Sequence, residues 1–128
     1  MLQKIEHYIS ALAQLEQAVA IYQKSRQDAL YRDGLIQRFE FTVELAWKSI
    51  KEYLEDQGST TPIATPRAVL KEAFAAGVIQ DAEEWNRIIT ARNITSHVYD
   101  EKTAEDVAAQ ICNDFLPLLK ALGKFYRD

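Results

Sequence analysis

Residues 35–57, LIQRFEFTVELAWKSIKEYLEDQ, carry the apolar pattern that decides the fold. Most of their apolar side chains recur at three- and four-residue steps, the period of an α-helix with one buried face. Phe41 and Leu45 lie off that stripe. A helix that is apolar on more than one side is typical of the centre of a bundle or of a contact with a second subunit. The stripe itself consists of Ile36, Phe39, Val43, Trp47, Ile50 and Leu54.

The segment before this helix contains a second periodic stretch and a turn signal. Apolar residues recur with the same period over residues 2–22, which predicts a first helix of about 25 residues. The polar stretch 23–34 follows and ends in Arg32-Asp33-Gly34. Because Asp and Gly favour turns, this tripeptide predicts that the chain turns there and that the next helix begins at Leu35.

Capping signals divide the rest of the chain into further helices. Thr65-Pro66 is typical of an N-cap followed by the first helical residue, and it predicts a short helix that ends at Ala76, with Gly77 as a left-handed cap. Asp81, followed three residues later by Glu84, predicts the start of another helix, which should end near residues 98–101.

Thr103 is predicted to cap the last helix. Pro117 lies well inside that helix and predicts a kink or a split near Asn113, because proline cannot make the helical hydrogen bond. The pattern as a whole predicts an all-α bundle of four main helices and one short helix. The apolar stripe of the last helix comprises Val107, Ile111, Phe115, Leu118 and Leu122.

Length and composition limit the class of protein. A chain of 128 residues with 48% hydrophobic residues and a net charge of −4 predicts one globular domain over residues 1–128. No apolar run is long enough to span a membrane, no secretory leader is evident, and Cys112 is the single cysteine. These features predict a cytoplasmic protein without membrane contact. The acidic balance argues against nonspecific coating of nucleic acid, which favours a basic surface.

Common catalytic motifs are missing from the sequence. It has no Gly-rich phosphate loop, no G-x-S-x-G nucleophile and no H-E-x-x-H zinc motif, so we predict neither a cofactor nor a metal. Glu40 and Glu44 lie four residues apart and share one side of the central helix. They could share a metal or a proton, but this spacing is more typical of a plain solvated face.

The one dense polar cluster is ARNITSHVYD, residues 91–100. On an ideal helix Asn93 and His97 share a face, whereas Arg92 and His97 lie about 140° apart. The two would meet if the helix loosens at its end, or if a second copy of the cluster faces the first. Arg92 paired with a nearby acid and His97 capping the helix is the simpler interpretation. Together, however, a titratable histidine and a fixed guanidinium suit phosphate chemistry.

The segment from Arg92 to Tyr99 matches R-x4-H-x-Y, the signature of the HEPN superfamily and especially of HepT-like toxins. Residues 37–48, QRFEFTVELAWK, and 66–74, PRAVLKEAF, also resemble proteins of this kind, as does Trp85 ahead of the motif. The same family is known as the nucleotidyltransferase substrate-binding proteins. The resemblance extends over roughly residues 2–122.

This resemblance implies an up-and-down four-helix bundle with an additional short helix, which forms a homodimer with two motifs facing one cleft. It also implies a metal-independent endoribonuclease that acts on an RNA such as tRNA or mRNA. His97 would move protons to or from the 2′-hydroxyl or the leaving oxygen. Arg92 would hold the scissile phosphate, and Asn93 would have a supporting role. Because the 2′-hydroxyl is the nucleophile, DNA should resist cleavage.

The resemblance further implies a partner, a minimal nucleotidyltransferase (MntA-like) antitoxin that transfers AMP to Tyr99. The added phosphate and nucleotide would block the cleft. Without the resemblance, we would interpret Tyr99 as an aromatic residue that packs at a helix end. The alternative function is a non-catalytic substrate-binding subunit of a separately encoded nucleotidyltransferase. The Arg92–His97 pair favours the ribonuclease, because a scaffold has no need of it.

The charge pattern limits where RNA can bind. Residues 22–38 have a local surplus of two positive charges, from Lys24, Arg26, Arg32 and Arg38 against two aspartates. This segment is predicted to border the cleft, and binding there should be modest and salt-sensitive.

Overall fold

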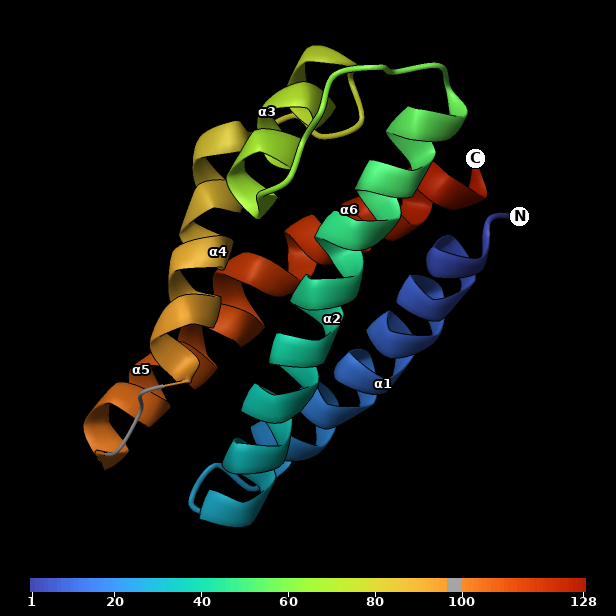
Figure 1. Ribbon diagram of the computed structural model, residues 1–128. Coiled ribbons are helices and arrows are strands. Elements are labelled where there is room, and N and C mark those ends of the chain that lie inside the picture. The colour runs from blue at the N-terminus through green and yellow to red at the C-terminus, as the bar shows by residue number, and fades with distance from the viewer. Residues whose placement is uncertain (97–99) are drawn as a thin grey trace.

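The computed structural model describes residues 1–96 and 100–128, and every regular element within them is helical (Figure 1). Four long helical runs alternate in direction along the bundle, and the short helix α3 lies at one end between α2 and α4. The predicted all-α, up-and-down bundle with one extra short helix is confirmed. The elements are α1 (Gln3–Lys24), α2 (Ala29–Asp56), α3 (Pro66–Ala75), α4 (Ala82–Thr95), α5 (Glu101–Gln110), a π-helical segment (Ile111–Phe115) and α6 (Leu116–Arg127).

The turn between α1 and α2 lies earlier than the sequence predicted. Asp28 caps α2, and its carboxylate accepts a hydrogen bond of 2.9 Å from the backbone N–H of Leu30. The prediction of a turn at Arg32-Asp33-Gly34 is wrong, because all three residues lie inside α2. A glycine within a helix costs about 1 kcal/mol, which the packing of α2 against α1 can offset.

The caps predicted around α3 are confirmed. The Thr65 hydroxyl accepts a hydrogen bond of 3.2 Å from the N–H of Ala68, and Pro66 is the first helical residue. Gly77 has a φ of +78°, the left-handed conformation that ends a helix and that a side chain would disfavour. These signals therefore determine where α3 begins and ends.

The connection between α4 and α5 differs from the prediction. The Asp81 side chain caps α4 as expected, but the helix ends at Thr95, before the predicted range of residues 98–101. The hydroxyls of Thr95 and Ser96 donate to carbonyls three residues earlier, at 2.7 and 2.8 Å. These bonds satisfy carbonyls that a longer helix would have used, and so favour an early end.

Asp100, rather than Thr103, caps α5. Its carboxylate accepts hydrogen bonds from the backbone N–H of Thr103, at 2.8 Å, and from the Thr103 hydroxyl, at 3.0 Å. The prediction failed because both residues are good caps, and the helix begins at the earlier one. The backbone bond first, and then the hydroxyl bond, lower the pKa of the Asp100 carboxyl below its ordinary value.

This lowered pKa predicts a pH-dependent contribution to stability. The Asp100 cap should stabilise the fold fully above the pKa of the unfolded state, near pH 4, and lose its effect as the pH falls through the lower folded value. The melting temperature of Asp100→Ala should therefore lie below that of the wild type at pH 7, and the gap should close in acid. The gap between Asp100→Asn, which caps without a charge, and Asp100→Ala should not change with pH. A gap between the wild type and Asp100→Ala that stays constant down to pH 2 would contradict the assignment.

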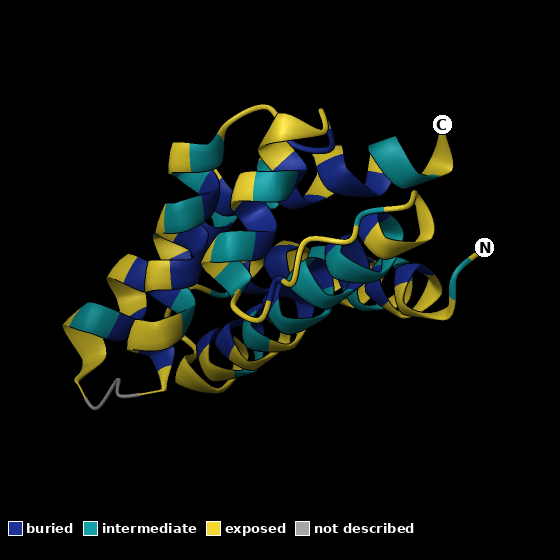
Figure 2. Cartoon of the chain, turned by 45° about the horizontal axis from the view of Figure 1, so that its top comes forward, coloured by how far each residue is buried: buried dark blue, intermediate teal, exposed yellow. Residues whose placement is uncertain are grey.

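The core lies inside the bundle, where α1, α2, α4 and the run from α5 to α6 turn their buried residues inward (Figure 2). The rings of Phe39 and Phe115 stack with centroids 5.8 Å apart, and the hydroxyl of the fully buried Tyr8 donates to the carbonyl oxygen of Leu119 at 2.7 Å. Burial raises the pKa of Tyr8, so its hydroxyl stays protonated and able to donate. None of the helices in the described part of the chain has an apolar stretch that could span a lipid bilayer.

The irregularity predicted for the last helix is confirmed. The π-helical segment Ile111–Phe115 includes Asn113 and ends two residues before Pro117. A proline ring clashes with the carbonyl four residues earlier, here that of residue 113, and a wider π turn makes room for it.

Candidate functional site between α2 and α4

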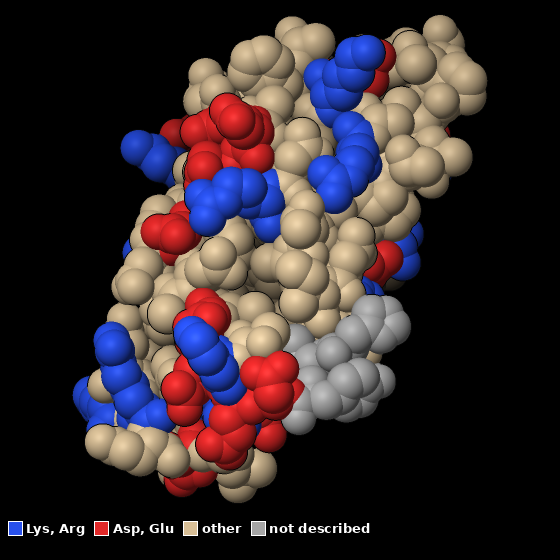
Figure 3. Space-filling model, turned by 90° about the vertical axis from the view of Figure 1, so that its left-hand side faces the viewer, with Lys and Arg blue, Asp and Glu red and all other residues tan. Residues whose placement is uncertain are grey.

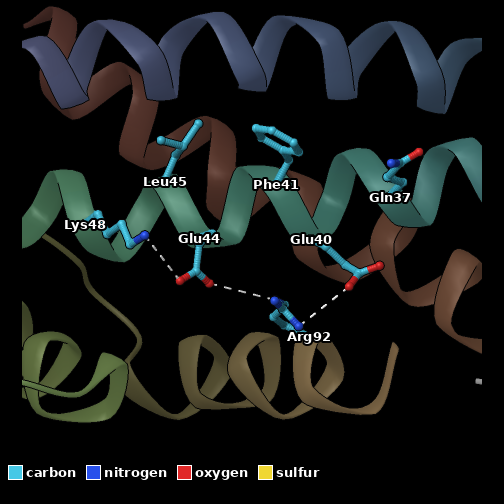
Figure 4. A pocket seen from close by; sticks show the side chains of 7 residues that line it. All are labelled: Gln37, Glu40, Phe41, Glu44, Leu45, Lys48 and Arg92. Atoms are coloured by element: carbon cyan, nitrogen blue, oxygen red, sulfur yellow. Dashed lines mark ion pairs between the residues drawn. The ribbon is translucent and has the colours of Figure 1, made fainter. Parts of the chain in front are cut away.

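Arg92 reaches from the last turns of α4 toward α2 (Figure 4). Its Nη1 lies 3.6 Å from an oxygen of Glu40, and its Nε lies 3.9 Å from an oxygen of Glu44. The other oxygen of Glu44 lies 3.7 Å from Nζ of Lys48. The two helices therefore share a row of charges that alternate in sign, and Arg92 lies between two carboxylates.

Arg92 lines an open hollow of about 450 Å³ between the two helices. The residues that α2 contributes combine charged and apolar groups, including Phe41, which is 66% exposed. The hollow is therefore large enough for part of a nucleotide, and both a guanidinium and an aromatic ring line it; in Figure 4 the Phe41 ring points from α2 toward α1, away from Arg92. Its lining residues are Gln37, Glu40, Phe41, Glu44, Leu45, Lys48 and Arg92.

The ion pairs of Arg92 hold it loosely. Both distances exceed the 2.7–2.9 Å of a typical charge-assisted hydrogen bond, and the guanidinium, Glu40 and Glu44 are all partly exposed to solvent. Exposed ion pairs of this kind contribute about 0–1 kcal/mol each. A phosphate, which guanidinium binds in a bidentate manner, can therefore compete with the two carboxylates for Arg92.

Glu40 and Glu44 do not form a plain solvated face. Each forms an ion pair with the Arg92 guanidinium across the interface between α2 and α4. Among the residues that the structure describes, no group of three or more histidine, cysteine or acidic side chains is placed to hold a metal ion. The acid pairing of Arg92 that the simpler interpretation expected is present.

The other predicted site residues are only partly placed. Asn93 follows Arg92 on α4 and is exposed, and its backbone carbonyl accepts the hydrogen bond from Ser96. His97 and Tyr99 lie outside the described residues. The structure thus brings Arg92 to the hollow beside Phe41, a residue that the sequence marked only as lying off the apolar stripe.

Two of the four basic residues predicted to border the cleft are engaged elsewhere. Arg32 is buried, with Nε 3.2 Å from Asp33 and Nη1 4.0 Å from Glu101. The guanidinium of Arg38 donates to the backbone carbonyl of Gln14 at 2.9 Å. The positive surplus of residues 22–38 therefore does not form a continuous basic border.

The fold and the site together define the class of this protein. It is an up-and-down four-helix bundle with the short helix α3 at one end, and an arginine of α4 lies in an open hollow beside α2. Comparison with known families then gives its membership. Residues 3–127 match the family described as nucleotidyltransferase substrate binding protein like, and the chain belongs to that family. The family predicted from the R-x4-H-x-Y resemblance is confirmed.

Individual relatives agree with this assignment. A protein of Haemophilus influenzae named probable ribonuclease HepT is 43% identical over 93 residues, which are 70% of this chain and 62% of that protein. The match thus spans less than two thirds of this relative. A solved H. influenzae structure, described as the fold of a substrate binding domain of a nucleotidyltransferase, superposes with a TM-score of 0.86 at 32% identity and covers 97% of this chain and 99% of that one. A crystal structure from Thermus thermophilus gives 0.77 at 28% identity, over 92% and 98% of the two chains.

Proposed function

We propose that this protein is a HepT-like toxin, a metal-independent endoribonuclease that a minimal nucleotidyltransferase partner neutralises. The observation that carries the proposal is Arg92, which lies in an open hollow and is held by weak ion pairs that a phosphate can replace. The name of the H. influenzae relative, probable ribonuclease HepT, supports the same activity.

Each motif residue has a role in this reaction. Arg92 exchanges its carboxylate partners for the scissile phosphate and stabilises the charge that develops on it. His97 takes the proton of the ribose 2′-hydroxyl, or gives a proton to the leaving 5′-oxygen, while the 2′-oxygen attacks phosphorus and the phosphorus–oxygen bond of the leaving group breaks. Asn93, next to Arg92 on α4, orients one of these groups.

The active form in this proposal is a homodimer. Phe41 and Leu45 lie on a face of α2 that no other described helix covers fully, and Phe41 lines the hollow that contains Arg92. A second copy packed on this face would cover an exposed aromatic side chain and bring a second Arg92 to the same cleft.

Tyr99 is the proposed site of neutralisation. An MntA-like nucleotidyltransferase would transfer AMP from ATP to the Tyr99 hydroxyl, with release of pyrophosphate. The negative charge and bulk of the nucleotide, close in sequence to His97, would then exclude RNA from the cleft.

A second candidate function is a non-catalytic subunit that binds substrate for a separately encoded nucleotidyltransferase. The description of the family and that of the solved H. influenzae structure both favour it. In this case the ion pairs of Arg92 would be structural contacts between α2 and α4.

Cleavage of RNA in EDTA separates the two candidates. The purified wild type should cut a mixture of tRNA and mRNA in the presence of the chelator and should leave DNA of the same sequence intact, because DNA lacks the 2′-hydroxyl. The products can be read on a denaturing gel. Intact RNA after long incubation with unmodified protein would refute the ribonuclease proposal and leave the binding subunit.

Neutralisation is tested in the same assay. Treatment with the partner nucleotidyltransferase and ATP should add AMP to the wild type and stop cleavage, whereas Tyr99→Phe should remain unlabelled and active. Mass spectrometry measures the label. Equal labelling of the two proteins would remove Tyr99 from this role without affecting the proposed cleavage.

A further inference from the structure

A stripe of two cations and one aromatic ring runs along the exposed face of α3. Arg67, Lys71 and Phe74 follow one another at steps of four and three residues, so they lie on one side of the helix. All three are exposed, Phe74 to 51%. The side chain of Glu72 lies about 140° from Arg67 around the helix, by the period of 3.6 residues. This stripe therefore presents positive charge beside an unburied ring.

The positive charge of this stripe is not neutralised by neighbouring acids. Among the described residues, neither Arg67 nor Lys71 forms an ion pair with a carboxylate, whereas Arg32, Arg87 and Arg92 all do. Figure 3 shows two basic patches near the upper edge of the side where α3 and α4 lie; acidic atoms lie beside the upper patch, and basic and acidic groups mix to the left of both patches and lower down. Two like charges one turn apart repel each other unless an anion binds between them.

Neutral groups of α4 hold Arg67 in place. Its Nη1 donates to the side-chain oxygen of Asn86 at 3.1 Å, and its Nη2 donates to the Thr90 hydroxyl at 3.0 Å. A guanidinium has five N–H donors, so most of them remain for a ligand. The head group is therefore oriented without loss of its charge, which favours a fixed contact with an anion.

Arg67, the first residue of the stripe, contacts α4 about one turn before the proposed cleavage site. Asn86, Thr90 and Asn93 are spaced by four and three residues and share one face of the helix. Thr90, which binds Arg67, lies about 4.5 Å along the axis from Asn93, by the rise per residue of a helix. An RNA strand bound beside Asn93 can therefore continue along this face of α4 toward Arg67.

We infer that the Arg67–Lys71–Phe74 stripe of α3 binds single-stranded RNA next to the cleavage site. Arg67 and Lys71, about 6 Å apart along the helix axis, contact successive phosphates, and Phe74 stacks on an unpaired base. This inference rests on the proposed function, because it takes RNA as the ligand. It adds a binding subsite that lies outside the R-x4-H-x-Y motif and reads no base edge, and it therefore predicts affinity without sequence preference.

Binding of an RNA that cannot be cut tests the subsite apart from catalysis. The probe is a fluorescent 20-nucleotide 2′-O-methyl RNA, and its Kd is measured by anisotropy between 50 and 300 mM salt. For Arg67→Gln/Lys71→Gln, the slope of log Kd against log salt should fall by about 1.4, or 0.7 for each lost phosphate contact. Phe74→Leu should weaken binding about fivefold or more at every salt concentration, because stacking is lost.

The controls separate a ligand contact from a structural one. Arg87→Gln/Lys102→Gln removes the same charge from exposed residues that are paired with acids, and it should keep the wild-type slope. Arg67→Lys should also keep the slope, because it retains the charge and loses only the fork that binds Asn86 and Thr90. If both Arg67 variants lost binding equally, Arg67 would be a link between helices and the inference would be wrong.

Two further outcomes would also overturn the inference. The first is a slope for Arg67→Gln/Lys71→Gln equal to that of the wild type. The second is unchanged RNA binding together with impaired AMP transfer by the nucleotidyltransferase, which would assign the stripe to a protein partner. Failure of the ribonuclease proposal looks different, because unmodified RNA would then stay intact while the 2′-O-methyl probe still bound in an α3-dependent way.

Discussion

Replacement of Arg92 by alanine should lower the rate of RNA cleavage about 100- to 1,000-fold, the usual cost of losing one group that stabilises developing charge. Among the described residues of α4, Arg92 alone lines the hollow, and it reaches the cleft as a rigid fork. Most of the loss should appear in kcat, because the charge that Arg92 stabilises grows in the transition state. Single-turnover rates in EDTA measure this step without contributions from product release.

Arg92→Lys should recover only part of the rate. A lysine supplies the charge but not the bidentate geometry that matches a phosphate. Arg87→Ala is the matched control, because Arg87 also lies on α4 and also pairs with two acids, Glu84 and Asp114. It should cut RNA at the wild-type rate. Equal loss in the Arg87 and Arg92 variants would indicate damage to α4 rather than to a catalytic group.

The carboxylates beside Arg92 lead to a related prediction about RNA affinity. Glu40 and Glu44 compete with the phosphate for the guanidinium, so Glu44→Gln should bind RNA more tightly than the wild type while retaining cleavage. The same substitution frees Lys48, which pairs with Glu44 in the wild type. If RNA affinity instead fell, the row of charges would be needed to hold Arg92 in position.

The sequence predicted the bundle because its signals were local. The period of the α2 stripe, the Thr65-Pro66 start of α3 and the effect of Pro117 each depend on neighbouring residues alone. Errors in where helices begin arose where two good signals compete. Asp28 competes with the later Arg32-Asp33-Gly34, and Asp100 competes with Thr103. In each pair the helix begins at the earlier signal, and local sequence alone does not rank the two.

The site was predictable in its residue types but not in its contacts. Arg92 could be picked out because the motif around it resembles a known family. Its pairing with Glu40 and Glu44 joins residues about fifty positions apart, and no local spacing reveals such a pair. The stripe on α3 is different. Its spacing of four and three residues was visible in the sequence, but only the structure shows that Arg67 binds Asn86 and Thr90 instead of an acid.

Replacement of Phe115 by alanine should reduce the free energy of unfolding by about 3–5 kcal/mol. Its ring is almost fully buried at the end of the π-helical segment and stacks on Phe39 of α2, so its removal leaves a cavity where the irregular last helix meets the centre of the bundle. For a protein of this size, the melting temperature should fall by roughly 10–20 °C.

Phe74→Ala is the matched control for this loss, because it deletes the same ring from an exposed position on α3. Its free energy of unfolding should stay within about 0.5 kcal/mol of the wild-type value. Urea denaturation followed by circular dichroism measures both variants. The two substitutions should also differ in their effect on RNA affinity. At 20 °C, the Phe115→Ala protein that is still folded should bind the 2′-O-methyl probe normally, whereas the stable Phe74→Ala protein should bind it weakly. If Phe115→Ala lost as little stability as Phe74→Ala, the stacked pair would not be part of the core that fixes α2.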